Sequence, residues 1–302
     1  MAISKVRVKI NGTWTVLTLN SSTGKYEGTI TAPSTTSYNL DGGYYPLEVE
    51  ATNDAGTVVT VTDSDATVGQ NLRLVVKETI KPVITLNTPT NGAYLQSNKP
   101  AITFTITDEA GGSGVKESSV SLKVDNTSYG VSAFTKTAVT NGFKYTFTPT
   151  SALSDGNHTI TINAKDNDGN AATEVSAGFV IDTVPPTLNV TSPTTEITNN
   201  PACVVEGTTN DATSSPVTVT VKLNSGTEQS VTVSSDGSFS KSITLSEGTN
   251  TVTVKAKDAA GRTTTVTKTV KLDTTVPKIA SVVLQPNPAN ASASVTISVE
   301  VE

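Results

Sequence analysis

Three segments of this sequence align without gaps and determine the fold: YPLEVEATNDAG (45–56), HTITINAKDNDG (158–169) and NTVTVKAKDAAG (250–261). In each of them every second residue is apolar before the chain reaches a closing glycine. This alternation predicts a half-buried β-strand that ends in a turn. The same strand therefore occurs three times, so the chain is expected to consist of repeated units.

Two further alignments support the repeat. One lies upstream of these strands and consists of VRVKIN (6–11), VSLKVD (120–125) and VTVKLN (219–224). The other marks the joints, where a strand begins just after a proline: KPVITLNTP (81–89), PPTLNVTSP (185–193) and VPKIASVVLQPNP (276–288). The dipeptides Asn141-Gly142 and Asp236-Gly237 are strong signals for hairpins between the aligned strands.

The composition points to the same architecture. Only 35% of the residues are apolar and 16% are charged, so Thr, Ser and Asn must supply much of the surface. Such a chain can fill several thin two-sheet cores but not one large interior. With β-sandwiches of about 100 residues each, 302 residues predict three of them.

At this point the sequence resembles the bacterial immunoglobulin-like repeat families. The resemblance rests on the D-T-x-P-P joint (182–186), the SGV segment (113–115) and the A-K-D-x-x-G strand end, which occurs twice. It covers essentially the whole chain and implies an all-β fold of tandem immunoglobulin-like β-sandwich domains in a rod. It also implies a structural spacer or adhesive module, as found in phage tail and virion proteins and in bacterial surface adhesins.

The alignment predicts the domain boundaries. We expect immunoglobulin-like domains at 1–80, 81–182 and 183–274, followed by the first two strands of an incomplete fourth domain at 275–302. Domain one lacks the first two strands of its sister domains, and three explanations remain open. The chain is part of a longer protein, or residues 60–70 close domain one, or residues 278–302 of one molecule complete domain one of another in a head-to-tail association.

Charge and targeting signals limit the partners. The net charge of −6 and the lack of basic runs argue against nucleic-acid binding. The first twenty residues hold no apolar core of a secretory signal, and no stretch is long and apolar enough to span a membrane. We therefore expect synthesis in the bacterial cytoplasm and a place on a virion, with the bacterial cell surface as the alternative. The expected partners are other structural proteins or cell-surface glycans.

Catalysis is not expected. His158 is the only histidine and shares an alignment column with Tyr45 and Asn250, which indicates the start of a strand rather than a general base. Cys203 is the only cysteine, so no disulfide can form within the chain, and its column predicts a buried, inert thiol.

Calcium is the one cofactor that the sequence suggests. Carboxylates gather near the joints, and related repeats often bind calcium there; the candidate ligands are Asp108, Glu109, Asp166, Asp168 and Asp182. The alternative is that the DNDG segment makes a turn without a metal. Domain three has Ala260 in the place of Asp168, so the site is not expected to recur there.

Domain one also has a candidate ligand surface. Trp14, Tyr44 and Tyr45 make it the most aromatic part of the chain, and such rings stack on sugars. The alternative interpretation, which we favour, is that Trp14 fills a core short of other large side chains.

Overall fold

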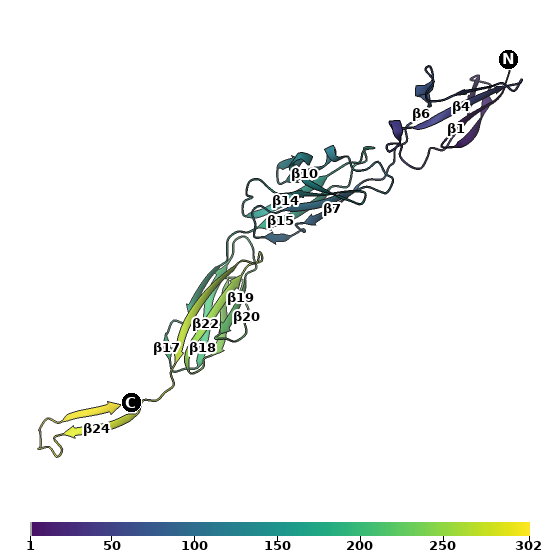
Figure 1. Cartoon of the computed structure of the whole chain (residues 1–302). Helices are drawn as coiled ribbons and strands as arrows, with labels where there is room; N and C mark the ends of the chain where they lie inside the picture. Colours follow the sequence, from purple (N-terminus) through teal and green to yellow (C-terminus); the bar gives the residue numbers. More distant parts are fainter. Residues whose placement is uncertain (1) are drawn as a thin grey trace. The chain divides into compact units, whose positions relative to one another are not determined.

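Strands make up nearly all of the regular structure in the computed structural model, which describes residues 2–302 (Figure 1). The helical elements within that range are four short 3-10 turns: η1 (Asp41–Gly43), η2 (Gly69–Leu72), η3 (Glu117–Ser119) and η4 (Val131–Ala133). The all-β prediction is therefore confirmed. By its internal contacts the chain divides into two compact units, residues 1–181 and 182–302, and each is described by itself.

Domain one, at the start of the first unit, is a single sheet with the strand order β3-β2-β1-β4-β5, and β6 attaches to β4. Its strands are β1 (Ile3–Ile10), β2 (Thr13–Asn20), β3 (Lys25–Glu27), β4 (Tyr45–Asn53), β5 (Val58–Val61) and β6 (Arg73–Leu74). The two repeated columns pair antiparallel, with Val8 of β1 opposite Val49 of β4. Because β5 pairs with the edge of β4, it widens this sheet rather than covering its apolar face.

Domain two, the rest of the first unit, is a sandwich of two sheets ordered β11-β10-β14-β15-β8 and β12-β13-β9-β7. Its strands are β7 (Val83–Thr88), β8 (Ala93–Leu95), β9 (Ile102–Thr107), β10 (Ser121–Val124), β11 (Thr127–Gly130), β12 (Thr135–Val139), β13 (Gly142–Phe147), β14 (Gly156–Asn163) and β15 (Val175–Ile181). In the core, the rings of Phe104 and Tyr145, from neighbouring strands of one sheet, stack with 5.3 Å between the ring centroids. Alternate residues of β9, Ile102, Phe104 and Ile106, are fully buried, as the period of two predicts.

Domain three, in the second unit, repeats this plan with sheets ordered β16-β18-β21 and β17-β23-β22-β19-β20. Its strands are β16 (Thr187–Ser192), β17 (Ile197–Thr198), β18 (Ala202–Asn210), β19 (Thr218–Leu223), β20 (Gln229–Val231), β21 (Ser238–Thr244), β22 (Gly248–Lys257) and β23 (Thr263–Leu272). Val205, Val221, Phe239, Val252, Val254 and Ala256 form its core, and Leu188 packs against it. An inward glycine, Gly207, makes room for the Phe239 ring, because a Cβ there would lie 2.6 Å from a ring carbon.

The strand pairs of the two sandwiches are antiparallel with one exception in each. The short strand β8 runs parallel to β15 in domain two, and β17 runs parallel to β23 in domain three. Both short strands follow the first strand of their domain, so they transfer the chain from one sheet to the edge of the other.

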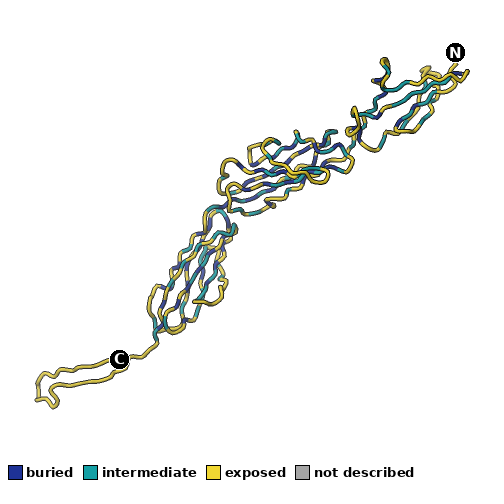
Figure 2. Tube along the Cα trace, in the orientation of Figure 1, coloured by how far each residue is buried: buried dark blue, intermediate teal, exposed yellow. Residues whose placement is uncertain are grey.

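The chain ends in a separate antiparallel hairpin of β24 (Ile279–Gln285) and β25 (Thr296–Val301). Figure 2 shows the contrast in burial: the strands of the two sandwiches alternate between buried and exposed residues, whereas the hairpin is exposed throughout.

Candidate functional site

Domain three gathers three buried carboxylates at one end of its sheets. Asp182 begins the second unit, Asp211 directly follows β18, and Asp258 directly follows β22. Each offers a carboxylate oxygen to a group whose members all lie within 4.8 Å of one another. The residues are 0%, 8% and 4% exposed, respectively. Three acidic groups at this distance and depth repel one another unless a proton or a cation lies among them.

The surrounding hydrogen bonds hold these side chains in place but leave one oxygen without a partner. Asp211 Oδ1 accepts hydrogen bonds from the backbone N–H groups of Thr213 and Ser214, at 2.8 and 2.7 Å. The Ser214 hydroxyl donates to Asp182 Oδ2. Asp258 Oδ1 accepts from the backbone N–H of Arg262 at 2.8 Å, whereas its Oδ2 is buried and has no hydrogen-bond partner. A buried carboxylate oxygen without a donor indicates that something outside the chain satisfies it.

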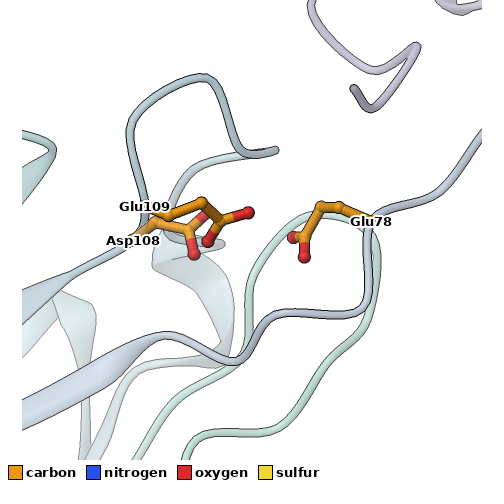
Figure 3. A group of neighbouring side chains, drawn as sticks. All are labelled: Glu78, Asp108 and Glu109. Atoms are coloured by element: carbon orange, nitrogen blue, oxygen red, sulfur yellow. The ribbon is translucent and has the colours of Figure 1, made fainter. Parts of the chain in front are cut away.

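Domain two has a second group, made of Glu78, Asp108 and Glu109 (Figure 3). Asp108 and Glu109 directly follow β9, and Glu78 comes from the segment that leads into the domain. Figure 3 shows the Glu78 carboxylate directed toward the other two. Asp108 is 7% exposed, and its Oδ1, like Oε2 of Glu109, is buried without a hydrogen-bond partner.

The ionisation of this second group reflects crowding of negative charge. Burial, followed by the hydrogen bond with Asp108, raises the pKa of Glu109 to about 7. Burial, followed by a hydrogen bond with Asp166, also raises the pKa of Glu78 above its usual value. Near neutral pH Glu109 therefore carries a proton part of the time, and a divalent cation could displace it.

The two groups occupy equivalent positions in the repeat. Glu78 and Asp182 each stand four residues before the proline at the start of the domain, and Asp108 and Asp211 each directly follow the third strand of the domain. Asp258 shares its alignment column with Asp166, which is fully buried and hydrogen-bonded to Glu78.

The expectation that the carboxylate site is absent from domain three is therefore wrong. It rested on Asp168, which Ala260 replaces, but Asp168 is not a member of the group in domain two. Its Oδ2 instead accepts hydrogen bonds from the Thr36 hydroxyl at 2.5 Å and from the Glu78 backbone N–H at 3.0 Å. Asp168 thus holds the segment that contains Glu78 in position.

Of the five predicted calcium ligands, Asp108 and Glu109 lie together and Asp182 lies in the equivalent group of domain three. Asp166 stabilises its own turn, because its Oδ1 accepts from the backbone of Gly169 and Asn170, while it also contacts Glu78. Sequence reasoning missed Glu78, Asp211 and Asp258. The columns of the repeat alignment contain the signal for Glu78 and Asp258.

Both donor sets suit a hard divalent cation. They consist of carboxylate oxygens, with neither histidine nor cysteine in either group. Calcium accepts six to eight oxygen ligands in flexible geometry, whereas zinc and copper favour nitrogen or sulfur. A surface hollow lined by Asp108, Glu109 and Phe143 gives the group of domain two a path to solvent.

The three aromatic residues of domain one do not form one platform. Tyr45 is buried, and its hydroxyl lies 2.6 Å from that of Thr35. The Tyr44 ring lies against the Arg73 guanidinium, 4.9 Å from the ring centroid. Trp14 is half-buried on the face opposite Val8 and Ile10, with the Arg7 guanidinium 4.2 Å from its ring centroid. The expectation that Trp14 fills the core is therefore wrong.

The surroundings of His158 and Cys203 indicate that both residues have structural roles. His158 is 6% exposed, and its Nδ1 and Nε2 lie 2.8 Å from Asp125 Oδ2 and from the Ser154 carbonyl. Cys203 is partly buried against Leu245, Val270 and Leu272, and burial raises the pKa of its thiol. A thiol with a raised pKa is a poor nucleophile.

No helix among residues 2–302 has the length and apolar character needed to cross a bilayer.

A family model described as a bacterial Ig-like domain matches residues 79–183, and one described as glucodextranase domain B matches residues 186–274. No curated protein sequence matches the chain.

Solved structures similar to the chain are also tandem β-domains. Fibronectin(III)-like modules of CbhA from Clostridium thermocellum are 17% identical with a TM-score of 0.41, and the match covers 63% of this chain and 94% of that one. A tetra-tandem repeat from the extending region of a large adhesion protein is 19% identical with a TM-score of 0.32, and the match covers 98% and 79%. These likenesses concern the fold alone. Bacterial Ig-like domains, the kind matched at residues 79–183, are generally non-catalytic.

Proposed function

We propose that this chain, a tandem array of bacterial immunoglobulin-like domains, is a non-enzymatic structural or adhesive segment whose joints are fixed by bound calcium. The observation that carries the proposal is the recurrence of the carboxylate group at equivalent places in domains two and three. In each domain one ligand comes from the segment that leads into the domain, and the others come from the domain itself. A cation bound there ties that segment to its domain.

Electrostatics supports the same conclusion. Without a cation, Asp182, Asp211 and Asp258 bury like charges close together, which costs several kcal/mol. A calcium ion reverses the sign of this interaction and satisfies the free oxygen of Asp258. Calcium would thus convert a destabilising cluster into a stabilising one.

We propose a phage tail or virion as the setting, with a bacterial cell-surface adhesin as the alternative. Both settings expose the chain to the medium, where calcium sites of about 10⁻⁴–10⁻³ M affinity are characteristic of extracellular modules. An antibody raised against the chain separates the two. Labelling of purified phage particles would support the virion, and labelling of intact, uninfected cells would support the adhesin.

A carbohydrate-binding role is the weaker candidate for domain one. The Arg7 guanidinium lies over the Trp14 ring, and Arg73 lies against Tyr44, so neither ring offers two free faces for stacking on a sugar. We therefore place the function in the joints rather than in the aromatic residues.

Calorimetric unfolding of the full chain with calcium or with a chelator tests the proposal. A ligand that binds only the native state stabilises it by about 2.7 kcal/mol at one hundred times its Kd, so calcium should raise the Tm of the transition of domain three. Asp258→Asn should abolish this shift and, with chelator present, leave the variant at least as stable as the parent. Asp236→Asn, in the exposed turn before β21, is the matched control and should keep the full response.

Isothermal titration at pH 8, where Glu109 with its pKa of about 7 is deprotonated, gives the stoichiometry. Two equivalents of calcium per chain are expected, and one for the Asp258→Asn variant. Identical melting curves with calcium and with chelator, together with no binding heat, would exclude calcium binding by the two carboxylate groups.

A further inference from the structure

One loop of domain one, residues 34–39, binds domain two at two separate points, and we call it the contact loop. The Asn39 side-chain amide donates a hydrogen bond to the Gly112 carbonyl at 2.6 Å. The Thr36 hydroxyl donates to Asp168 Oδ2 at 2.5 Å, and Thr36 is only 4% exposed. Both contacts lie within the first compact unit of the chain. The contact loop thus bonds to two different loops of domain two.

The first contact point lies directly against the carboxylate group of domain two. A Cβ on Gly112 would lie 2.6 Å from the carboxyl carbon of Glu109 and 2.9 Å from Asp108 Oδ2, so the Gly112 backbone packs on both carboxylates. The Gly112 N–H also donates to the Glu109 carbonyl at 3.1 Å. Asn39 lines the hollow that connects this group to solvent. A movement of these two carboxylates therefore displaces the carbonyl to which Asn39 donates.

The second contact point leads to Glu78, the third member of the group. Asp168 Oδ2 accepts from the Glu78 backbone N–H at 3.0 Å as well as from the Thr36 hydroxyl. The Ser113 hydroxyl donates to Glu78 Oε1 at 3.1 Å and accepts from the Asp168 backbone N–H at 3.0 Å. Ser113 is 2% exposed, so these bonds form one buried network. The position of Glu78 is therefore determined by the same loops that the contact loop binds.

The carboxylate group is unsatisfied without a ligand. Asp108 is 7% exposed, and its Oδ1 has no hydrogen-bond partner. Glu78 approaches the other two members from a separate segment (Figure 3). Like charges favour separation of this segment from the loop after β9, whereas a bound cation draws the two together. Cation binding therefore brings together the two loops to which Asn39 and Thr36 donate.

We infer that the contact loop of domain one strengthens calcium binding by the carboxylate group of domain two. Thr36 and Asn39 are positioning residues, because they act on the ligands through Asp168 and Gly112. Coupling between two binding events is reciprocal, so calcium bound at this group also holds domain one on domain two. The inference rests on the proposed function, because it takes calcium as the ligand of this group.

The carboxylate group of domain three provides an internal control. Ala260 stands in the column of Asp168 and has no side-chain oxygen to accept a hydrogen bond. Arg262 Nε donates to the Asp182 carbonyl at 2.9 Å, so this group has a bond to its leading segment from within its own domain. Changes in the contact loop should therefore leave the calcium affinity of domain three unaltered.

Isothermal titration of the full chain with calcium at pH 8 tests the inference in an Asp258→Asn background, which leaves domain two as the single expected site. Thr36→Val removes the hydroxyl with little change of shape, and Asn39→Ala removes the amide. Each should raise the Kd at least about fivefold, the lower end of usual coupling factors. Thr36→Ser keeps the hydroxyl, and Ser34→Ala changes an exposed position of the same loop, so both should keep the parent Kd.

The same substitutions in an Asp108→Asn background, where the site of domain three is the single expected one, should leave the Kd unchanged. This comparison separates a positioning role from a general loss of stability, which would affect both backgrounds.

Reciprocity gives a second readout, because Trp14 is the only tryptophan and lies in domain one. Calcium should raise the midpoint of thermal unfolding followed by Trp14 fluorescence in the Asp258→Asn chain. The further substitutions Thr36→Val and Asn39→Ala together should remove this shift.

The outcomes distinguish the inference from the proposed function. An Asp258→Asn chain that binds no calcium would overturn the proposed function for domain two and this inference with it. A chain that binds calcium with the same Kd before and after Thr36→Val and Asn39→Ala would overturn the inference alone. Equal weakening in the Asp108→Asn background would also overturn it, because the effect would not act through the group of domain two.

Discussion

His158 shares its alignment column with Asn250, and the structure gives both residues the same task. His158 pairs with Asp125, and Asn250 pairs with Asn224, the residue in the column of Asp125. In both domains the paired residue also accepts the backbone N–H that follows, Thr159 in domain two and Thr251 in domain three. The side-chain pair thus connects the start of β14 to the end of β10, and the start of β22 to the end of β19.

This equivalence predicts that the pair of domain three can replace that of domain two. His158→Ala should destabilise domain two by about 1–3 kcal/mol, because it removes a buried ring that stacks on Phe179 and pairs with Asp125. The double variant His158→Asn with Asp125→Asn should recover most of this loss. Chemical unfolding of these variants, and of His158→Asn and Asp125→Asn alone, measures the coupling. Equal losses in the single and double variants would contradict the equivalence.

Tyr145 gives domain two a pH dependence at the alkaline end. Its ring is fully buried, its hydroxyl lacks a hydrogen-bond partner, and burial raises its pKa to about 12. The unfolded chain ionises from the ordinary pKa of about 10, so it loses protons before the folded chain does. The stability that neutral Tyr145 contributes is therefore present below pH 10 and is lost as the pH rises toward 12.

Tyr145→Phe should remove this loss and leave the stability at pH 7 unchanged or raised by about 1 kcal/mol, because it deletes an unsatisfied buried hydroxyl. Urea unfolding at pH 8 and pH 11 measures both effects. Tyr94→Phe, at an exposed position, is the control and should keep the alkaline loss of the parent chain.

At the scale of single elements, β22 shows how strictly the alternation determines burial. Along this strand Val252, Val254 and Ala256 are fully buried, whereas the side chain of Lys255 is 39% exposed, 4.0 Å from Glu228. Val254→Asp would bury an unpaired charge between the sheets, so domain three should not fold. Lys255→Asp should cost less than about 1 kcal/mol, because exposed ion pairs contribute little. Circular dichroism and thermal melting of the two variants make the comparison.

The alternation also explains which parts of the fold could be predicted. A strand with one buried face repeats its apolar residues every second position, so the columns of the repeat and the core of domain three followed from the sequence. Trp14 was misplaced because its strand, TWTVLTLN, has aliphatic residues on both faces, and only the pairing with Lys9 shows its side.

The carboxylate groups could be predicted only in part, because their members come from segments far apart in the chain. Asp166 and Asp168 stand out as a local motif, and yet Asp168 bonds to Thr36 and the backbone of Glu78. Asp211 and Asp258 look like ordinary turn residues in the sequence. Only the packing of the loops after β18 and β22 brings them together with Asp182.

At the scale of the whole molecule, domain three should be an independent folding unit. Its two core clusters consist of residues between Leu188 and Leu272, and its three buried carboxylates lie between Asp182 and Asp258. Residues 182–274 expressed alone should unfold in one cooperative transition, with a calcium response like that of the full chain. A non-cooperative transition or an aggregated product would show that the fragment needs its neighbours.

The parallel pairing of β17 with β23 determines how domain three responds to a mechanical pull. β17 belongs to the segment that starts the domain and β23 is its last strand, and the Lys271 N–H and Asp273 N–H donate to the carbonyls of Glu196 and Thr198. A force on the two ends of the domain draws these strands in opposite directions along their length. All hydrogen bonds between them must then break together, whereas an antiparallel hairpin pulled from its open end gives way one bond at a time. Stretched end to end, the domain should resist as a shear joint, and a force applied across the β22–β23 hairpin should open it far more easily.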